Sequence, residues 1–157
     1  MAHGQYTHYM QRIDIPNQNE IDVEEFFPGL YYMSAKGIND IGKPKNVYTE
    51  EYADSDRKRF YLPEENNYAN ESTTIDMTFL VIGTAAQRQS TISSFLDYVR
   101  KGVHLYHDTA RNRAFEFIVT DEIKVSDEKW HGSTPYIELT LPLQNLNGKT
   151  REYQNET

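Results

Sequence analysis

The sequence predicts one mainly β domain: a β-sandwich or split barrel with one flanking α-helix at about residues 85–101 and a long loop or hairpin. Three observations lead to this prediction. Aromatic residues make up 13% of the chain, with 12 tyrosines against one tryptophan, and such a composition favours sheets. Several segments alternate apolar and polar residues with the period of two that is typical of strands. A single segment repeats its apolar residues with helical spacing instead.

The chain length predicts a single domain, which we place at residues 21–147 of the 157. Residues 1–20 are polar and show no sustained helix or strand periodicity, so we expect an N-terminal arm. Residues 148–157 are polar and charged, and we expect a C-terminal tail. Both ends are expected either to move freely or to dock on a partner.

The first strands are predicted on either side of a long polar stretch. Pro28 and Gly29 indicate a turn, and a strand is expected after it at 30–35. Residues 38–70 form a long loop or hairpin, rich in Asn and Asp. Within it, residues 58–62 alternate charged and aromatic side chains, so we expect a hairpin with arms at about 46–52 and 57–62.

The clearest strand is predicted at 72–82, where every second residue is apolar: Ile75, Met77, Phe79 and Val81. The opposite face is polar at first and ends in Leu80 and Ile82. We therefore expect this end of the strand to be buried on both faces.

The flanking helix has a start signal, an apolar stripe and a stop signal. Thr84 and Gln87 have the spacing of a capping box, in which a hydroxyl and an amide satisfy backbone donors. Gly102 provides the C-terminal cap. One face is apolar at helical spacing: Ile92, Phe95, Leu96 and Val99.

Four strands are predicted after the helix, at 103–107, 113–120, 122–130 and 134–145, and turn residues separate them. The last strand carries Ile137, Leu139, Leu141 and Leu143 on one face. Pro142 lies on its other face, and since proline donates no hydrogen bond to a ladder, we expect an edge position or a bulge there.

Charge and composition exclude several classes of function. The net charge is -8 with a pI of about 5.1, so the exterior repels nucleic acid and duplex recognition is not expected. The absence of cysteine excludes disulfides, thiolate nucleophiles and thiolate metal ligands. The longest strictly apolar run, at 79–82, is too short for a membrane span. We expect a soluble, intracellularly made protein without a membrane anchor.

No catalytic, cofactor-binding or metal-binding residue is expected. His104 and His107 are three residues apart on a predicted strand and therefore face opposite sides, as surface or barrel-rim histidines. Asp54 begins a stretch like a calcium loop, but Lys58 occupies a ligand position, so a solvated loop is the simpler interpretation. Nucleophile, phosphate-loop and zinc-protease motifs are absent. A pair of carboxylates brought together only by the fold stays open, and with it a small hydrolase.

Aromatic residues in the loop and the arm are the candidate subunit interface. Tyrosine is enriched at interfaces because it buries a large area at low entropic cost. The alternative is that these rings fold back onto the sheet. The candidates are Tyr6, Tyr9, Tyr48, Tyr52, Phe60, Tyr61 and Tyr68.

Four segments carry a resemblance to a known family: IDMTFLVIG, SSFLDYVRKG, VHLYHDTARNRAFEFIVTDEI and PYIELTLPLQN. In element order and hydrophobic pattern they resemble the tail-tube fold of bacteriophage tail tube, tube-completion and distal tail proteins. The nearest likeness is to the N-terminal domain of distal tail proteins. It covers about 72–145. The chain is shorter than a typical distal tail protein, and we expect no second domain in it, so a tube subunit and a short adaptor ring both stay open.

The resemblance implies a structural subunit rather than an enzyme. It implies self-association in a ring, usually a hexamer, that builds or caps a tube through which DNA passes without specific binding. Neighbouring tail or baseplate proteins would be its partners, and it would be assembled in the bacterial cytoplasm and located in the virion tail. The alternative is a β-sandwich module that binds carbohydrate or peptide, which requires a concave aromatic-lined face. Oligomeric state separates the two hypotheses.

Overall fold

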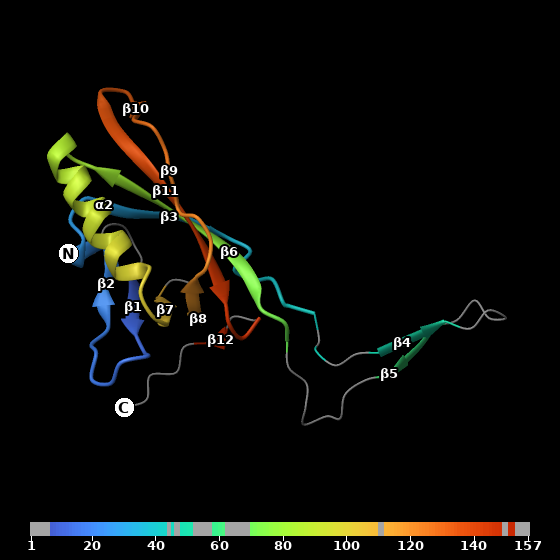
Figure 1. Cartoon of the computed structure of the whole chain (residues 1–157). Coiled ribbons are helices and arrows are strands. Elements are labelled where there is room, and N and C mark those ends of the chain that lie inside the picture. Colours follow the sequence, from blue (N-terminus) through green and yellow to red (C-terminus); the bar gives the residue numbers. More distant parts are fainter. Residues whose placement is uncertain are drawn as a thin grey trace.

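The computed structural model describes residues 7–43, 45, 48–51, 58–61, 70–109, 112–148 and 151–152, and it describes only the backbone at 48–51, 58–61 and 151–152. These residues form an open antiparallel sheet of ten strands, a separate two-stranded sheet and one main helix (Figure 1). The predicted class, mainly β and sandwich-like with one flanking helix, is confirmed.

The path of the main sheet is β2 (Ile21–Asp22), β1 (His8–Arg12), β7 (His104–Asp108), β8 (Arg113–Val119), β11 (Thr134–Asn145), β6 (Thr73–Ile82) and β3 (Leu30–Lys36). Two short strands, β9 (Lys124–Val125) and β10 (Lys129–His131), pair with β11. A third, β12 (Arg151–Glu152), pairs with β8. Consecutive strands are therefore often neighbours, as in an antiparallel meander.

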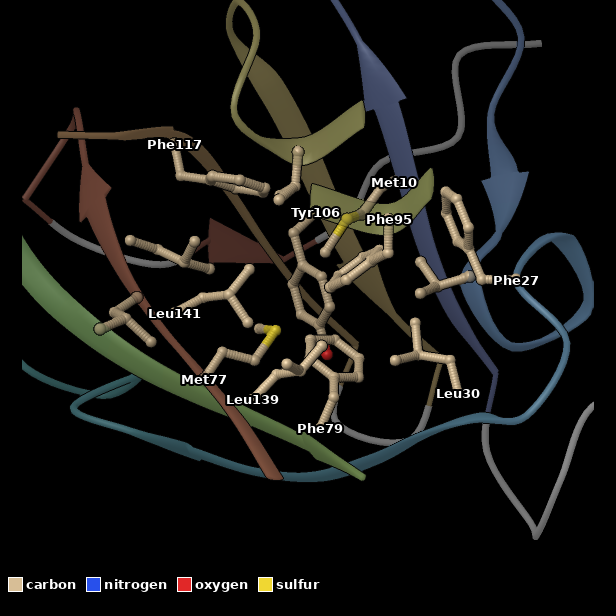
Figure 2. Close-up of a cluster of buried hydrophobic side chains, with 14 of the residues drawn as sticks. Met10, Phe27, Leu30, Met77, Phe79, Phe95, Tyr106, Phe117, Leu139 and Leu141 are labelled. Atoms are coloured by element: carbon tan, nitrogen blue, oxygen red, sulfur yellow. The ribbon is translucent and has the colours of Figure 1, made fainter. Parts of the chain in front are cut away.

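Strand β11 joins the two halves of the sheet. It pairs with β6 from Tyr136 opposite Ile82 to Asn145 opposite Thr73, and its last three residues also pair with β8. Side chains from the two halves meet in one core. Figure 2 shows Tyr106 from β7 between Met10 of β1 and Met77 of β6, and all three belong to the same core cluster.

The alternation predicted for β6 and β11 is confirmed. The predicted inward residues of β6 are all 0% exposed, and so are three of the four in β11: Ile75, Met77, Phe79, Val81, Leu139, Leu141 and Leu143. The fourth, Ile137, is partly buried against the same core. Period-two patterning therefore identified the core face of both long strands.

The predicted helix is α2 (Ala85–Val99), and it begins with the expected capping box. The backbone N–H of Gln87 donates to Thr84 Oγ1 at 3.2 Å, and the backbone N–H of Thr84 donates to Gln87 Oε1 at 3.0 Å. Phe95 carries the contact with the core, since its ring lies 5.1 Å from those of Phe27 and Phe79. The helix thus covers the sheet through its apolar stripe.

The N-terminal residues differ from the expected arm. Residues 8–12 form β1, which pairs with β7 on one side and β2 on the other. Met10 from this strand is fully buried. A four-residue helix, α1 (Val23–Phe26), follows β2 and is capped by the side chain of Asp22. These elements are too short for periodicity to reveal them.

The strand predicted at 122–130 is interrupted. Its residues form β9 and β10, separated by a kink where the backbone N–H of Ser126 donates to Glu138 O and Ser126 Oγ accepts from Glu138 N, both at 2.9 Å. Pro142 of β11 pairs in register with Asp76 of β6. On the other side of β11, the pairing with β9 ends at Thr140 and the pairing with β8 begins at Leu143. Pro142 therefore lies in a gap between these two ladders.

The hairpin expected within 46–62 corresponds to β4 (Tyr48–Glu51) and β5 (Lys58–Tyr61), which pair antiparallel. They form a sheet of their own, and Figure 1 shows them lying away from the main sheet. In sequence this hairpin lies between β3 and β6.

Truncation of a core leucine tests the sheet register. Leu141→Ala should lower the free energy of unfolding by about 2–5 kcal/mol, because it removes a fully buried side chain and leaves a cavity. Thr140→Ala, the adjacent residue on the opposite face, should change it by less than about 0.5 kcal/mol. Urea unfolding of both variants measures the difference, and equal losses would contradict the register.

A matched pair of glycines tests the turn before β3. Both Gly29 and Gly132 have positive φ, but a Cβ at Gly29 would lie 2.4 Å from the carbonyl oxygen of Ile82, whereas one at Gly132 meets nothing within 4 Å. Gly132→Ala should cost about 1–2 kcal/mol of backbone strain. Gly29→Ala should cost roughly 1–3 kcal/mol more, because a backbone neighbour must move. Melting temperatures of the two variants give the comparison.

Candidate interaction surfaces

The predicted interface aromatics fall into three groups. Tyr6, Tyr52 and Tyr68 lie outside the described residues. A second group belongs to the hairpin, where Tyr48 is the register partner of Tyr61, and Phe60 that of Thr49. Tyr9 lies in β1. The fold therefore brings Tyr48, Phe60 and Tyr61 into one two-stranded unit and places Tyr9 in the main sheet instead.

Tyr9 is partly buried and packs on its register partner His107, with ring centroids 5.7 Å apart and planes inclined by 18°. His107 Nδ1 also lies 3.4 Å from Glu20 Oε1. Its strand neighbour three positions earlier, His104, faces the interior. The prediction that the two histidines lie on opposite faces is confirmed, but His104 is a core residue rather than a surface or rim histidine.

His104 is held as a neutral ring in the core. Its Nε2 lies 2.7 Å from the carbonyl oxygen of Lys101, and because a carbonyl only accepts, Nε2 carries the proton. The ring stacks on Phe117, with centroids 5.3 Å apart. Burial is the main cause that lowers the pKa of His104 below the ordinary value of 6.5.

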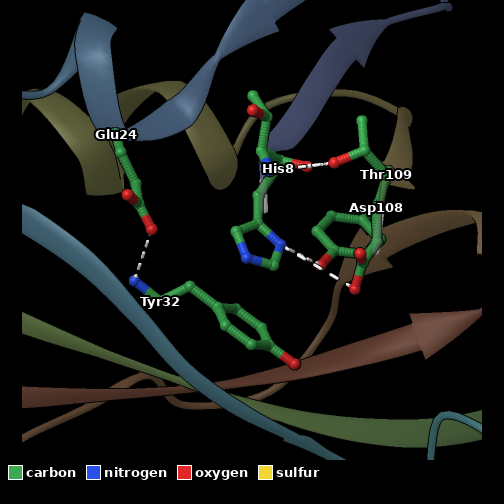
Figure 3. A network of polar contacts seen from close by, with 7 residues as sticks. His8, Glu24, Tyr32, Asp108 and Thr109 are labelled. Carbon is green, nitrogen blue, oxygen red and sulfur yellow. Dashed lines mark hydrogen bonds and ion pairs between the residues drawn. The ribbon is translucent and has the colours of Figure 1, made fainter. Parts of the chain in front are cut away.

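A buried polar cluster secures the start of β1 (Figure 3). His8 is 5% exposed, and its Nδ1 lies 2.7 Å from the hydroxyl of Tyr106 and 3.9 Å from Asp108 Oδ2. The ring of Tyr32 stacks on His8, with centroids 3.9 Å apart. Beside it, the backbone N–H of Thr109 donates to Thr7 O at 3.1 Å. Because Tyr106 and Asp108 are fully buried, the cluster joins β1 to β7 and β3 inside the fold.

The outer face of strands β3, β6 and β11, opposite the core, is apolar at one end. We call this end the outer strip and define it as Met33, Leu80, Ile82 and Tyr136. With His131, Thr134 and Glu138 the strip lines a shallow hollow of about 370 Å³. Met33 is 52% exposed. The end of β6 was expected to be buried on both faces, whereas the fold covers one face and leaves Leu80 and Ile82 partly exposed on the other.

The other end of the same outer face is polar. It forms a hollow of about 490 Å³ whose charged side chains have both signs: Lys36, Asp76, Asp121, Glu122 and Lys124. Thr74, Thr78 and Thr140 complete the surface together with Ser34 and Pro142. The outer face therefore divides into an apolar strip and a charged region.

A third hollow, of about 510 Å³, lies between α2 and the turn before β3. Phe26, which is 60% exposed, borders it with Phe27, and Gln87, Ser90 and Ser94 come from the helix. Thr91 Oγ1 donates to Pro28 O at 2.6 Å and fixes the turn against the helix. This hollow combines exposed aromatic area with hydrogen-bonding groups.

Ion pairs border the outer strip and hold the segment between β8 and β11. Lys129 of β10 contacts Glu138 of β11, and this hydrogen bond, followed by the attraction of the two charges, raises the pKa of Lys129. Buried Arg88 of α2 reaches Glu128 at 2.5 Å. The carboxylate at the margin of the strip is therefore neutralised by a neighbour.

The described residues contain no cluster of three or more His, Asp or Glu side chains that could bind a metal ion. Asp54, considered for a calcium loop, lies outside them. Among the helices in the described part of the chain, none is long and apolar enough to cross a membrane.

The outer strip was not among the predicted interface residues. The signal that could have identified it is the run of four apolar residues that ends β6, Phe79–Ile82, because such a run needs cover on both faces of a sheet. Met33 and Tyr136 carry no such signal, since only the strand registers bring them beside Leu80 and Ile82.

Comparison with known proteins identifies the fold. No family model matches the sequence, and no curated protein matches it. Among solved structures, the chain is similar to SPP1 Dit (gp 19.1), a hub protein of the adsorption apparatus in phages that infect Gram-positive bacteria. The TM-score is 0.55 at 10% identity, and the match covers 93% of this chain and 52% of SPP1 Dit. This chain thus shares the fold of part of SPP1 Dit and spans about half the length of that protein.

Two structures of the phage p2 baseplate in its activated conformation, with Sr and with Ca, give TM-scores of 0.49 and 0.48. Their identities to this chain are 8% and 9%, and the matches cover 89% and 88% of it. Each match covers 44% of the baseplate chain.

The buried histidine predicts a pH dependence of stability. Because the folded pKa of His104 is lowered, its contribution is fully present above the unfolded value of about 6.5 and is lost as the pH falls through that value toward the folded one. His104→Phe and His104→Asn should both flatten unfolding free energy against pH between 7 and 5. Each substitution should reduce the slope of unfolding free energy against pH by less than about 1.4 kcal/mol per pH unit, which is the limit for the uptake of one proton.

The two variants control for each other, because phenylalanine keeps the packing on Phe117 and asparagine keeps a donor for the carbonyl of Lys101. Their absolute stabilities should differ, and their loss of pH dependence should agree. Urea unfolding at several pH values measures both quantities, and a wild-type slope in both variants would exclude His104 as the titrating group.

Proposed function

We propose that this chain is a structural subunit of a bacteriophage or phage-like tail and forms rings that build or cap the tube through which DNA passes. The observation that carries the proposal is the likeness of its fold to SPP1 Dit over 93% of the chain. The chain would act by assembly, without catalysis or a cofactor, in the virion tail after assembly in the bacterial cytoplasm. Its partners would be further copies of itself, six in the ring, and neighbouring tail or baseplate proteins.

The separate hairpin supports self-association. A two-stranded hairpin is at best marginally stable in water by itself, and it needs a surface to cover it. Strands β4 and β5 pair with each other in a sheet distinct from the main one. Tyr48, Phe60 and Tyr61 give this unit the aromatic content of an interface. A neighbouring subunit would supply the missing surface.

The net charge of -8 is compatible with DNA transit. Acidic groups that face the lumen of a ring would repel phosphates, so that DNA slides through without specific binding. A net acidic charge also keeps a protein soluble, so charge supports the proposal without carrying it.

A second candidate function is a carbohydrate- or peptide-binding module. The hollow between α2 and the turn before β3 favours it, because Phe26 and Phe27 lie beside Gln87, Ser90 and Ser94. Exposed aromatic area next to hydrogen-bonding groups is typical of such sites. This function requires no self-association.

The mass of the purified protein in solution over a concentration series separates the two candidates, followed by negative-stain microscopy of the largest species. Rings or stacked tubes are the expected result. A strictly monomeric particle at every concentration would favour the binding module.

Excision of the hairpin tests its part in assembly. Replacing residues 44–69 by a short Gly-Ser linker should leave the main sheet folded, because Glu71 N already donates to Lys43 O at 2.7 Å and holds the ends together. We expect the circular dichroism of the body to persist, and the concentration needed for assembly to rise at least tenfold. The control is Ser93→Lys on the exposed face of α2, which should assemble normally. Unchanged rings after excision would contradict the role of the hairpin.

A further inference from the structure

We propose that the outer strip is the surface that receives the β4–β5 hairpin of a second copy of this chain. The inference rests on the proposed assembly into rings and names the two surfaces that meet in it. One is the strip of Met33, Leu80, Ile82 and Tyr136, and the other is the hairpin that lies apart from its own sheet.

The strip has the character of a surface that lacks its cover. Leu80 and Ile82 belong to an apolar run whose alternate residues, Phe79 and Val81, are fully buried in the core. A strand that is apolar on both faces is typical of a sheet covered on both sides. Here the outer side has only a shallow hollow, beside which Met33 is 52% exposed. An apolar partner in this hollow would complete the burial of β6.

Charge favours the same occupant. The chain carries a net charge of -8, so two copies repel each other over most of their surfaces. At the strip, the carboxylate of Glu138 is neutralised by Lys129. The hairpin strands carry Glu50 and Glu51 on β4 against Lys58 and Arg59 on β5, and the register pairs them across the strands. The paired strand residues carry two charges of each sign, so their contact with the strip meets little net repulsion.

The positions of the two surfaces favour a second copy. In sequence the hairpin lies between Lys36, the last residue of β3, and Thr73, the first residue of β6, and both Lys36 and Thr74 line the polar end of the outer face. Leu80 and Ile82 lie seven to nine residues further along β6, roughly 22–31 Å away at the usual rise. Figure 1 shows the hairpin extending away from that end of the sheet. Donor and acceptor at opposite ends give a head-to-tail contact, the kind that closes into a ring.

The edge of β3 beside the strip is closed to strand addition. The backbone N–H of Tyr32 donates to Glu24 Oε1 at 3.1 Å, and the register of β3 with β6 shifts between Tyr32 and Ser34. A carboxylate on the edge and a bulge are both devices that prevent edge pairing. The hairpin would therefore dock on the face of the sheet through side chains and not extend the ladder.

The absence of cysteine in the chain allows a direct test by mixing. One chain carries Met33→Cys alone, and the other carries Thr49→Cys or Glu50→Cys alone. Successive strand residues face opposite sides, so one of the two hairpin positions would face the strip. The full-length chains are mixed under assembling conditions, oxidised and analysed by mass. We expect one of the two hairpin variants to form a disulfide-linked dimer with the Met33→Cys chain. The other hairpin variant should give at least tenfold less of this mixed dimer.

The matched control replaces Met33→Cys by Thr78→Cys, which lies on the same outer face at its polar end and should give no mixed dimer. A charge in the strip supplies a second readout: Leu80→Glu should abolish rings while Thr78→Glu, at similar partial exposure, leaves them intact. Rings without mixed cross-links, or rings formed by Leu80→Glu, would overturn the strip as acceptor and leave ring assembly standing. Wild-type chains that stay monomeric at every concentration would overturn both proposals.

Discussion

Strand β11 pairs with β6 over ten consecutive register positions, and its last three residues pair with β8 as well. Because one strand belongs to both halves of the sheet, the position of each half relative to the other depends on this pairing. The inward side chains Leu139, Leu141 and Leu143 follow the strand from one half to the other and stay fully buried throughout. A shift of one residue in this register would turn all three to solvent, so the hydrophobic pattern and the topology specify each other.

The helix depends on the same core. Phe95 lies between the rings of Phe27 and Phe79, and a single aromatic contact therefore links α2, the turn before β3 and β6. The capping box at Thr84 starts the helix directly after β6 ends, so the helix returns over the inner face of the strand that precedes it. Since α2 occupies the inner side, the outer face of β3, β6 and β11 is the side of the sheet available for a partner. The split of that face into an apolar strip and a charged region follows the sequence of β6, whose outward residues change from Thr74, Asp76 and Thr78 to Leu80 and Ile82.

The long elements were predictable because their patterns repeat. The boundaries of β11 and the cap of α2 agree with the prediction. These elements have 12 and 15 residues, which is long enough for the spacing of apolar residues to be recognised. Strand β1 was missed because it has five residues, and its burial comes from Met10 and from the pairing of His8 with Tyr106, which is 98 positions away. The outer strip could not be assembled from sequence either, because Met33 meets Leu80 through a register with a bulge.

Closed edges and an unpaired face together indicate how such a sheet can associate. Strand β2 ends the sheet after two residues, and β3 ends it with a carboxylate on the backbone of Tyr32, so neither border offers a long free ladder. In the proposed ring, the specificity of subunit association then comes from side chains on the outer face of the sheet, where a single added charge is costly. Backbone hydrogen bonds between subunits contribute little. A surface of this kind tolerates wide sequence change as long as its apolar character persists. A fold likeness at 10% identity without a matching family model is compatible with that tolerance.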